Sequence, residues 1–365
     1  MLPATSTDFR FDPHPSPVAA SERAERLVDP GFGRVFTDHM ALIRWSEERG
    51  WHDAAITARV PLTMDPSAAV LHYAQEIFEG LKAYRLADGG TALFRADANA
   101  RRFRDSARRL AMPELPEELF LESCRRLVET ERNWIPTIEG GALYLRPFMI
   151  ASEAFLGVKP SAEYLYMVLA SSVGNYWKGG ERAVSIWVSE QFTRAAPGGT
   201  GAAKCGGNYA ASLAAQAEAI RQGCDQVVFL DAAERRWVEE LGGMNVFFVF
   251  DDGSLQTPPL RGTILPGITR ASIIRLARDA GLTVREEGYA IDQWRADAAS
   301  GRLTEAFACG TAAVVTAIGE VAGVDGRFTV GGGGPGQVTQ RIKAELTAIQ
   351  RGAAPDPHGW VQRVV

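Results

Sequence analysis

Apolar residues in the first half of the chain recur at helical spacing in some segments and at strand spacing in others. Between residues 98 and 111, Phe103, Ala107 and Leu110 lie on one face of a predicted helix. We expect the other elements of this half to be a helical stretch that begins at 72–76 and includes Tyr73 and Phe78, a proline-initiated helix at 116–132, and strands at 91–94, 142–146 and 164–171. This mixture predicts an α/β domain.

The second half combines apolar runs with glycine-terminated helical segments. Three of its runs follow one another with short polar turns, which predicts a β-meander. The expected strands are 183–189, 226–231, 237–241, 246–250 and 305–309, and the expected helices are 210–221, 269–280 and 338–350. We therefore predict a mixed α+β and α/β fold with an extended N-terminal arm (1–30), a smaller α/β domain (31–173), a linker (174–182) and a larger domain (183–365).

The composition excludes several classes of protein. A net charge of −5 argues against general binding to nucleic acids or to a membrane surface. The four cysteines are widely spaced and the five histidines form no ligand cluster, so no metal and no disulfide framework are expected. We find no signal peptide and no apolar run of about 20 residues that could span a bilayer. A cytoplasmic location is the resulting expectation.

One lysine lies in an unusual segment, Gly-Gly-Thr-Gly-Ala-Ala-Lys-Cys-Gly-Gly-Asn-Tyr at 198–209. Only five of the 39 basic residues are lysines. Small neighbours around Lys204 would disfavour its charged form and favour Schiff-base chemistry. A solvated lysine in a glycine loop is the alternative, and the segment alone does not decide between the two.

Four further features could complete a site around this lysine. Glu239 and Glu240 are adjacent in an apolar strand, so alternation should turn only one inward, where it would need a partner such as a protonated pyridine nitrogen; two exposed meander residues are the alternative. The segments 265–269 and 310–313 each predict a helix start that could bind a phosphate. The arginine-rich helix at 99–110 should be mostly solvated, with one arginine available as a fixed cation.

These segments, taken in order, resemble the branched-chain amino acid aminotransferases, which are pyridoxal-phosphate enzymes of fold type IV. The resemblance extends from about Phe32 to Trp360. It is carried by Phe-Gly-x-x-Phe-Thr-Asp-His-Met at 32–40, Leu-His-Tyr-x-x-x-x-Phe-Glu-Gly-Leu-Lys-Ala-Tyr at 71–84, Tyr-Leu-Arg-Pro-Phe at 144–148, the lysine segment, Glu-Leu-Gly-Gly-Met-Asn at 240–245, Leu-Pro-Gly-Ile-Thr-Arg at 265–270 and Gly-Thr-Ala-Ala at 310–313.

The resemblance implies a two-domain enzyme with its active site at the domain interface and pyridoxal 5'-phosphate bound to Lys204, which would also move the substrate proton. Tyr209 would contact the phenolic oxygen of the cofactor, and Glu240, rather than Glu239, the pyridine nitrogen. The other implied cofactor ligands are Arg102, Leu265, Ile268, Thr269 and Thr311. The implied substrate contacts are Phe32, Tyr73, Phe78, Tyr144, Arg146, Val158, Tyr176 and Ala312, of which Tyr73 and the loop 156–158 would come from the partner subunit of a homodimer.

The implied reaction is ping-pong transamination between L-leucine, L-isoleucine or L-valine and 2-oxoglutarate. Alternatives are another fold type IV enzyme, such as a D-amino acid or amine transaminase or an aminodeoxychorismate-type lyase, and a regulatory protein that only binds the cofactor. The sequence departs from some relatives at Gly243 and at 313–316, and Trp177 is a further residue that could alter the pocket. Gly243 replaces a hydroxyl residue, Trp177 adjoins Tyr176, and residues 313–316 lack the cysteines of a redox switch.

Overall fold

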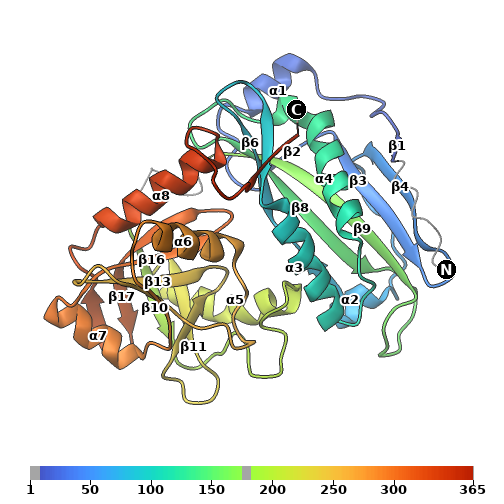
Figure 1. Ribbon diagram of the computed structural model, residues 1–365. Coiled ribbons are helices and arrows are strands. Elements are labelled where there is room, and N and C mark those ends of the chain that lie inside the picture. Colours follow the sequence, from blue (N-terminus) through green and yellow to red (C-terminus); the bar gives the residue numbers. More distant parts are fainter. Residues whose placement is uncertain (1–8, 175–181, 365) are drawn as a thin grey trace. The chain divides into compact units, whose positions relative to one another are not determined.

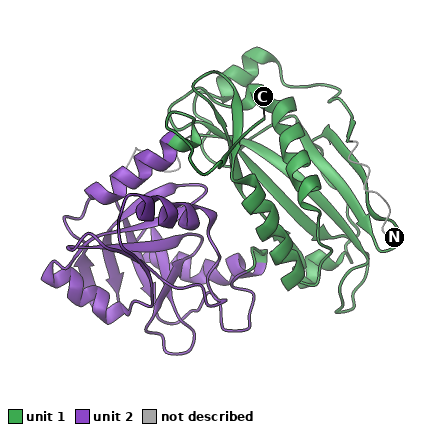
Figure 2. Ribbon diagram, viewed as in Figure 1, with its two compact units in different colours: residues 1–178, 203–206, 349–365 green, residues 179–202, 207–348 purple. Residues whose placement is uncertain are grey.

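The computed structural model describes residues 9–174 and 182–364 (Figure 1). The chain forms two compact units, each built around one large sheet (Figure 2). Unit 1 comprises residues 1–178, 203–206 and 349–365, and unit 2 comprises 179–202 and 207–348. Both units combine helices with a sheet, so the predicted mixed class is confirmed. The predicted linker falls largely on residues 175–181, which lie outside the described residues.

Unit 1 contains a ten-stranded sheet in the order β1-β4-β3-β9-β8-β6-β7-β19, with β2 paired to β9 and β5 paired to β8. Its long antiparallel centre is the β8–β9 pair, which is in register from Ala142 opposite Val173 to Ala151 opposite Tyr164. The strands are β1 (Arg10–Phe11), β2 (Val35–Phe36), β3 (His39–Ser46), β4 (Gly50–Ala58), β5 (Glu76–Phe78), β6 (Leu81–Arg85), β7 (Thr91–Phe94), β8 (Ala142–Ala151), β9 (Glu163–Val173) and β19 (Val361–Arg363).

Two amphipathic helices, α3 (Ala96–Arg109) and α4 (Glu117–Glu131), lie side by side across one face of this sheet (Figure 1). The Phe103 ring centroid is 5.5 Å from those of both Phe120 and Tyr166, so aromatic packing joins the helices to β9. Both helices begin and end within two residues of the predicted bounds. Unit 1 also contains the short helices α1 (Ala20–Arg26) and α2 (Ala69–Tyr73) and a 3₁₀ turn at Arg132–Trp134.

Unit 2 is built on a nine-stranded sheet in the order β12-β11-β10-β17-β16-β13-β14-β15, with β18 paired to β17. Its core includes the stacked rings of Phe247 and Phe307, with centroids 5.1 Å apart. The strands are β10 (Val184–Ser189), β11 (Gln226–Leu230), β12 (Val238–Leu241), β13 (Asn245–Phe250), β14 (Leu255–Thr257), β15 (Val284–Glu286), β16 (Leu303–Gly310), β17 (Val314–Gly323) and β18 (Gly326–Thr329). The helices are α5 (Gly206–Arg221), α6 (Ile268–Asp279), α7 (Ile291–Ser300) and α8 (Gln337–Gln350).

Two predicted elements are wrong. The helical stretch from 72 does not reach Phe78, because Ala74 adopts a left-handed conformation that ends α2, and Phe78 then pairs with Phe148 of β8. The expected meander is also absent: β11 pairs with β12 as predicted, but β13 pairs with β14 and β16 and not with β12. In both cases a pairing partner distant in sequence overrides the local pattern.

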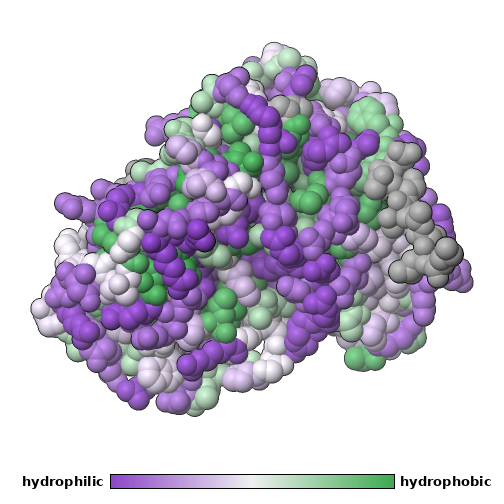
Figure 3. Space-filling view, in the orientation of Figure 1, coloured by the Kyte–Doolittle hydropathy of each residue, from purple (hydrophilic) through white to green (hydrophobic). Residues whose placement is uncertain are grey.

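Hydrophilic residues cover most of the face shown in Figure 3, with apolar residues scattered among them. Among the described residues, no helix has the length and apolar content needed to cross a membrane.

Candidate active site

Lys204 lies in the part of the glycine-rich segment that belongs to unit 1. Main-chain bonds hold it on both sides. Its N–H donates to Ser106 Oγ (2.9 Å), and its carbonyl accepts from the N–H of Phe78 (2.9 Å). Nζ lies 4.9 Å from the centroid of the Phe78 ring. Residues of α3 and β5 therefore fix the backbone of Lys204 and place its amine over an aromatic face.

A fully buried carboxylate, Glu79, lies next to this lysine and holds Arg102. Arg102 donates from Nε and a terminal nitrogen to the two oxygens of Glu79 at 2.7 and 2.8 Å, and Asn99 donates at 2.7 Å. Burial alone would raise the pKa of Glu79, but the charges of Arg102 and Lys204 and these hydrogen bonds outweigh it and lower the pKa. Arg102 is thus a buried, fixed cation in an otherwise mostly solvated row of arginines.

We expect Glu79→Gln to destabilise the protein by about 3–5 kcal/mol at pH 7, because it leaves the Arg102 charge buried without its counter-charge. Since the folded state lowers the pKa of Glu79, its stabilising contribution is present above the ordinary glutamate pKa and is lost as the pH falls through the folded value. Urea unfolding at pH 7 and at decreasing pH should show the wild-type advantage shrinking. Glu114→Gln removes an exposed partner of Arg108 and should cost under about 1 kcal/mol; an equal cost at both positions would contradict the account.

Aromatic rings and one arginine line the same part of unit 1. The Arg146 guanidinium lies 4.7 Å from the Phe78 ring centroid and donates to the Tyr144 hydroxyl at 3.2 Å. The Phe32 ring packs edge-on against Tyr144 at 5.1 Å. Gly80 makes room for this arrangement, because a Cβ there would lie 2.1 Å from the Tyr144 hydroxyl. The buried Nε of Arg146 has no hydrogen-bond partner among the described residues, which leaves a donor for a ligand.

In unit 2, Glu240 of β12 is the centre of a second buried network. One of its oxygens lies 2.9 Å from a terminal nitrogen of Arg194 and accepts from the N–H of Leu265 at 2.9 Å. The other oxygen accepts from the Asn245 amide at 3.2 Å. Three donors therefore hold this carboxylate in one orientation.

Glu239 is buried as well, contrary to the prediction that only one of the two glutamates would turn inward. Strand alternation does separate them, but the loop that carries Thr263 covers the second face, and the Thr263 hydroxyl donates to Glu239. Burial raises the pKa of Glu239, and the other oxygen of its carboxylate has no partner among the described residues.

The predicted anion site at 265–269 is the start of helix α6. Gly267 is its N-cap residue, and α6 has no side-chain cap. A Cβ at Gly267 would lie 1.9 Å from Asn245 Oδ1, so glycine is required there. Leu265 and Thr269 are buried and Ile268 is half-buried. The first-turn amides and the positive end of the helix dipole favour a bound anion.

The second predicted helix start, at 310–313, is wrong. Residues 311–313 form the turn of the hairpin between β16 and β17, with Gly310 paired to Val314. Strand pairing on both sides overrides the local glycine–threonine signal. Thr311 and Ala312 are half-buried in this turn.

The other residues predicted to contact the cofactor or the substrate lie in separate parts of the two units. Tyr209 lies in the first turns of α5, and a Cβ at Gly243 would lie 3.5 Å from Cε1 of its ring, an ordinary contact distance. Tyr73 and Val158 are exposed in unit 1, where the Tyr73 hydroxyl donates to the carbonyl of Leu156. Tyr176 and Trp177 lie outside the described residues.

The residues that orient the predicted cofactor-binding side chains are not among the residues predicted from the sequence. Glu79 fixes Arg102, while Arg194 and Asn245 fix Glu240. Glu79 and Asn245 stand inside the motifs quoted above, so their position in those motifs was an available signal. Arg194 is an isolated arginine and carries no local signal.

Most of the chain is similar to proteins of known family and structure. Residues 76–321 match the family model described as Amino-transferase class IV. The branched-chain-amino-acid aminotransferase of Mycolicibacterium smegmatis is 54% identical over 361 residues, 98% of each chain. The solved branched-chain amino acid aminotransferase of Escherichia coli is 30% identical, with a TM-score of 0.74 over 90% of this chain and 99% of its own. A branched-chain amino acid aminotransferase from T.th., solved with pyridoxamine 5'-phosphate, is 31% identical, with a TM-score of 0.73 over 89% and 99%.

Proposed function

Since the chain belongs to the branched-chain amino acid aminotransferases of the class IV family, we propose that it transfers the amino group of L-leucine, L-isoleucine or L-valine to 2-oxoglutarate through pyridoxal 5'-phosphate. The products are a branched-chain 2-oxo acid and L-glutamate. One carrier serves both half-reactions, so the first product leaves before the second substrate enters, and the cycle is ping-pong.

The observation that carries this proposal is the arrangement of Lys204, Phe78, Tyr144 and Arg146 within unit 1. Aromatic surface beside an amine suits a branched apolar side chain. The available Nε of Arg146 and the Tyr144 hydroxyl suit the second carboxylate of glutamate. A single surface can therefore accept both substrates.

The buried groups fit the chemical groups of pyridoxal phosphate. In unit 1, Arg102 is a fixed cation suited to a phosphate; in unit 2, Ile268 and Thr269 at the start of α6 and the hydroxyl of Thr311 are likewise suited to one. Glu240 is an anion suited to a protonated pyridine nitrogen. We assign Tyr209 to the phenolic oxygen and Leu265 to the ring face, with Ala312 beside the substrate. When bound, the cofactor supplies an electron sink that stabilises negative charge at the substrate α-carbon.

The protein's own residues hold and move protons around this sink. Glu240, held by Arg194 and by the Leu265 N–H, would keep a proton on the pyridine nitrogen. Lys204 Nζ would take the proton from the substrate α-carbon, and the aromatic face of Phe78 would exclude water from that side.

We further propose a homodimer in which Tyr73 and the loop 156–158 complete the partner's substrate site. Large apolar side chains are exposed on one short helix and this loop, namely Leu71, Tyr73, Leu156 and Val158, of which Val158 is 86% exposed.

The four cysteines are all free, which supports a reducing, cytoplasmic location.

Val158→Asp is expected to weaken the dimer, because it puts a charge into an apolar interface. Light scattering coupled to size exclusion should show a larger monomer fraction at micromolar concentrations. Val324→Asp, at a similarly exposed valine of unit 2, is the control and should leave the mass unchanged. A wild-type monomer at high concentration would contradict the proposed assembly.

The direct test of function is turnover of a substrate panel with 2-oxoglutarate. We expect L-glutamate to form from L-leucine, L-isoleucine and L-valine, and D-alanine and simple amines to be poor donors. Efficient turnover of D-alanine without turnover of L-leucine would overturn the proposal in favour of another fold type IV activity.

A further inference from the structure

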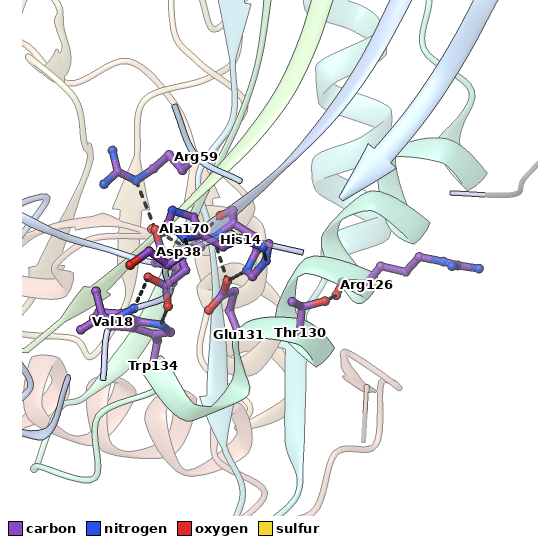
Figure 4. Close-up of polar contacts among 12 residues, drawn as sticks. His14, Val18, Asp38, Arg59, Arg126, Thr130, Glu131, Trp134 and Ala170 are labelled. Atoms are coloured by element: carbon purple, nitrogen blue, oxygen red, sulfur yellow. Dashed lines mark hydrogen bonds and ion pairs between the residues drawn. The ribbon is translucent and has the colours of Figure 1, made fainter. Parts of the chain in front are cut away.

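One quoted motif, Thr37-Asp38-His39, takes no part in the proposed reaction. Its polar groups instead fasten residues 9–30, here called the arm, to the rest of unit 1 (Figure 4). The arm begins as strand β1, which pairs in parallel with β4, and Phe9 is buried in the core. The side chains of Asp38 and His39 then hold two main-chain N–H groups of the arm.

His39 is fixed in one tautomer by its surroundings. Its Nε2 accepts from the N–H of His14 at 2.9 Å. Its Nδ1 lies 2.5 Å from Glu131 Oε1, which also accepts from the His39 N–H at 2.8 Å. Because a backbone N–H can only donate, Nε2 carries no proton, and Nδ1 donates to the carboxylate. Glu131, which is 3% exposed, thereby aims His39 at the arm.

Asp38 makes a second attachment four residues further along the arm. Its two oxygens accept from the Val18 N–H at 3.1 Å and from Trp134 Nε1 at 3.2 Å. The guanidinium of Arg23, in helix α1, lies 5.9 Å from the Trp134 ring centroid. Asp38 thus fixes both the arm and the surface on which α1 packs.

The arm leads directly to Phe32, a proposed substrate contact. Gly31 and Gly33 have φ values of +61° and +69°, so the chain turns sharply on both sides of Phe32. The Gly31 carbonyl accepts from the Gly174 N–H at 3.1 Å, and the Phe32 ring rests on Tyr144. The position of this ring therefore depends on the path of the arm.

We propose that Asp38 and His39 are positioning residues that hold the arm so that Phe32 completes the aromatic surface for the branched side chain. This inference rests on the proposed function, since Phe32 and Tyr144 are substrate contacts in it. In this proposal, Asp38 and His39 influence the affinity for the substrate and do not affect the proton transfer at Lys204.

A matched pair of variants isolates one hydrogen bond. His14→Pro removes the N–H that donates to His39, whereas His14→Ala removes the same side chain and keeps the N–H. We expect His14→Pro to raise the KM for L-leucine about three- to tenfold, the effect of one lost hydrogen bond, with kcat within about twofold of wild type. His14→Ala loses the contacts of the His14 ring with the Ser16 N–H and the His39 ring but keeps the main-chain hydrogen bond, so it should raise KM much less than His14→Pro. Hydrogen exchange of amides in the arm should accelerate more in His14→Pro than in His14→Ala.

A double variant tests whether the two residues act as one unit. His39→Ala should add little to the KM of His14→Pro, because both remove the same contact. His52→Ala, at a histidine of neighbouring strand β4 whose ring contacts the Gly50 carbonyl, should leave KM unchanged. If exchange accelerates in His14→Pro while KM stays at the wild-type value, or if His14→Ala and His14→Pro raise KM equally, the inference is overturned. A wild-type protein that does not convert L-leucine at all would instead overturn the proposed function.

Discussion

Replacing Lys204 with alanine is expected to lower transamination of L-leucine by about 10⁴-fold, the upper end of the range for a lost proton-transfer group, while the fold persists. The fold persists because the bonds to Ser106 and Phe78 are made by the main chain of Lys204. Activity is lost because alanine has no amine that could bind the cofactor or carry the substrate proton.

Lys204→Arg is the informative companion variant. It keeps a positive charge near Glu79, and so preserves the electrostatic environment of the buried Glu79–Arg102 pair, but an arginine can neither bind the cofactor covalently nor shuttle the proton. Turnover should be lost as completely as in Lys204→Ala, with thermal unfolding close to wild type. Lys343→Ala, at a lysine of helix α8, should be fully active. Substantial turnover by either Lys204 variant would refute its assignment as the reacting amine.

Replacing Glu240 with glutamine is expected to lower kcat by about 10²- to 10³-fold, as for loss of one preorganised electrostatic contact. A neutral amide cannot keep the proton on the pyridine nitrogen. The substitution also leaves the Arg194 charge buried without its counter-charge, at a cost of about 3–5 kcal/mol in unfolding free energy.

Glu239→Gln provides a control one residue away. Glu239 is also buried, but it faces Thr263 and its pKa is raised by burial, so a neutral side chain at this position should be well tolerated. The rate of the first half-reaction with L-leucine, followed by stopped-flow absorbance, compares the two variants directly. A larger loss in Glu239→Gln than in Glu240→Gln would show that the other glutamate serves the cofactor.

The elements that could be predicted from the sequence are those set by local spacing. Helices α3 and α4 carry their apolar residues on one face, and the predicted bounds of both agree with the structure within two residues. Strand pairing is a long-range property, which is why local spacing predicts helix for β5 and a meander for β13, and both predictions are wrong. The prediction of a helix start at 310–313 is wrong for the same reason, since the turn at 311–313 is defined by the pairing of β16 with β17.

The candidate site also combines residues that could be named from the sequence with contacts that depend on folding. Lys204 and Glu240 stand in quoted motifs and Arg102 in the arginine-rich helix, so the resemblance could name all three from the sequence. The contacts that orient them join residues apart in the sequence, 23 positions in the case of Glu79 and Arg102, and these pairings are established only by folding. The burial of both Glu239 and Glu240 could not be predicted either. Alternation along a strand places the two side chains on opposite faces, but it does not show that another segment covers the second face.

The central claim is that Lys204, with its cofactor, accepts the amino group of a branched-chain L-amino acid. The most direct measurement is the visible spectrum of the purified, cofactor-loaded protein during addition of L-leucine without any oxo acid. We expect the absorption of the bound cofactor to give way to that of pyridoxamine 5'-phosphate, with release of an equimolar amount of 4-methyl-2-oxopentanoate, while D-leucine leaves the spectrum unchanged. A spectrum that ignores L-leucine but responds to D-amino acids, or a protein that binds no cofactor on reconstitution, would contradict it.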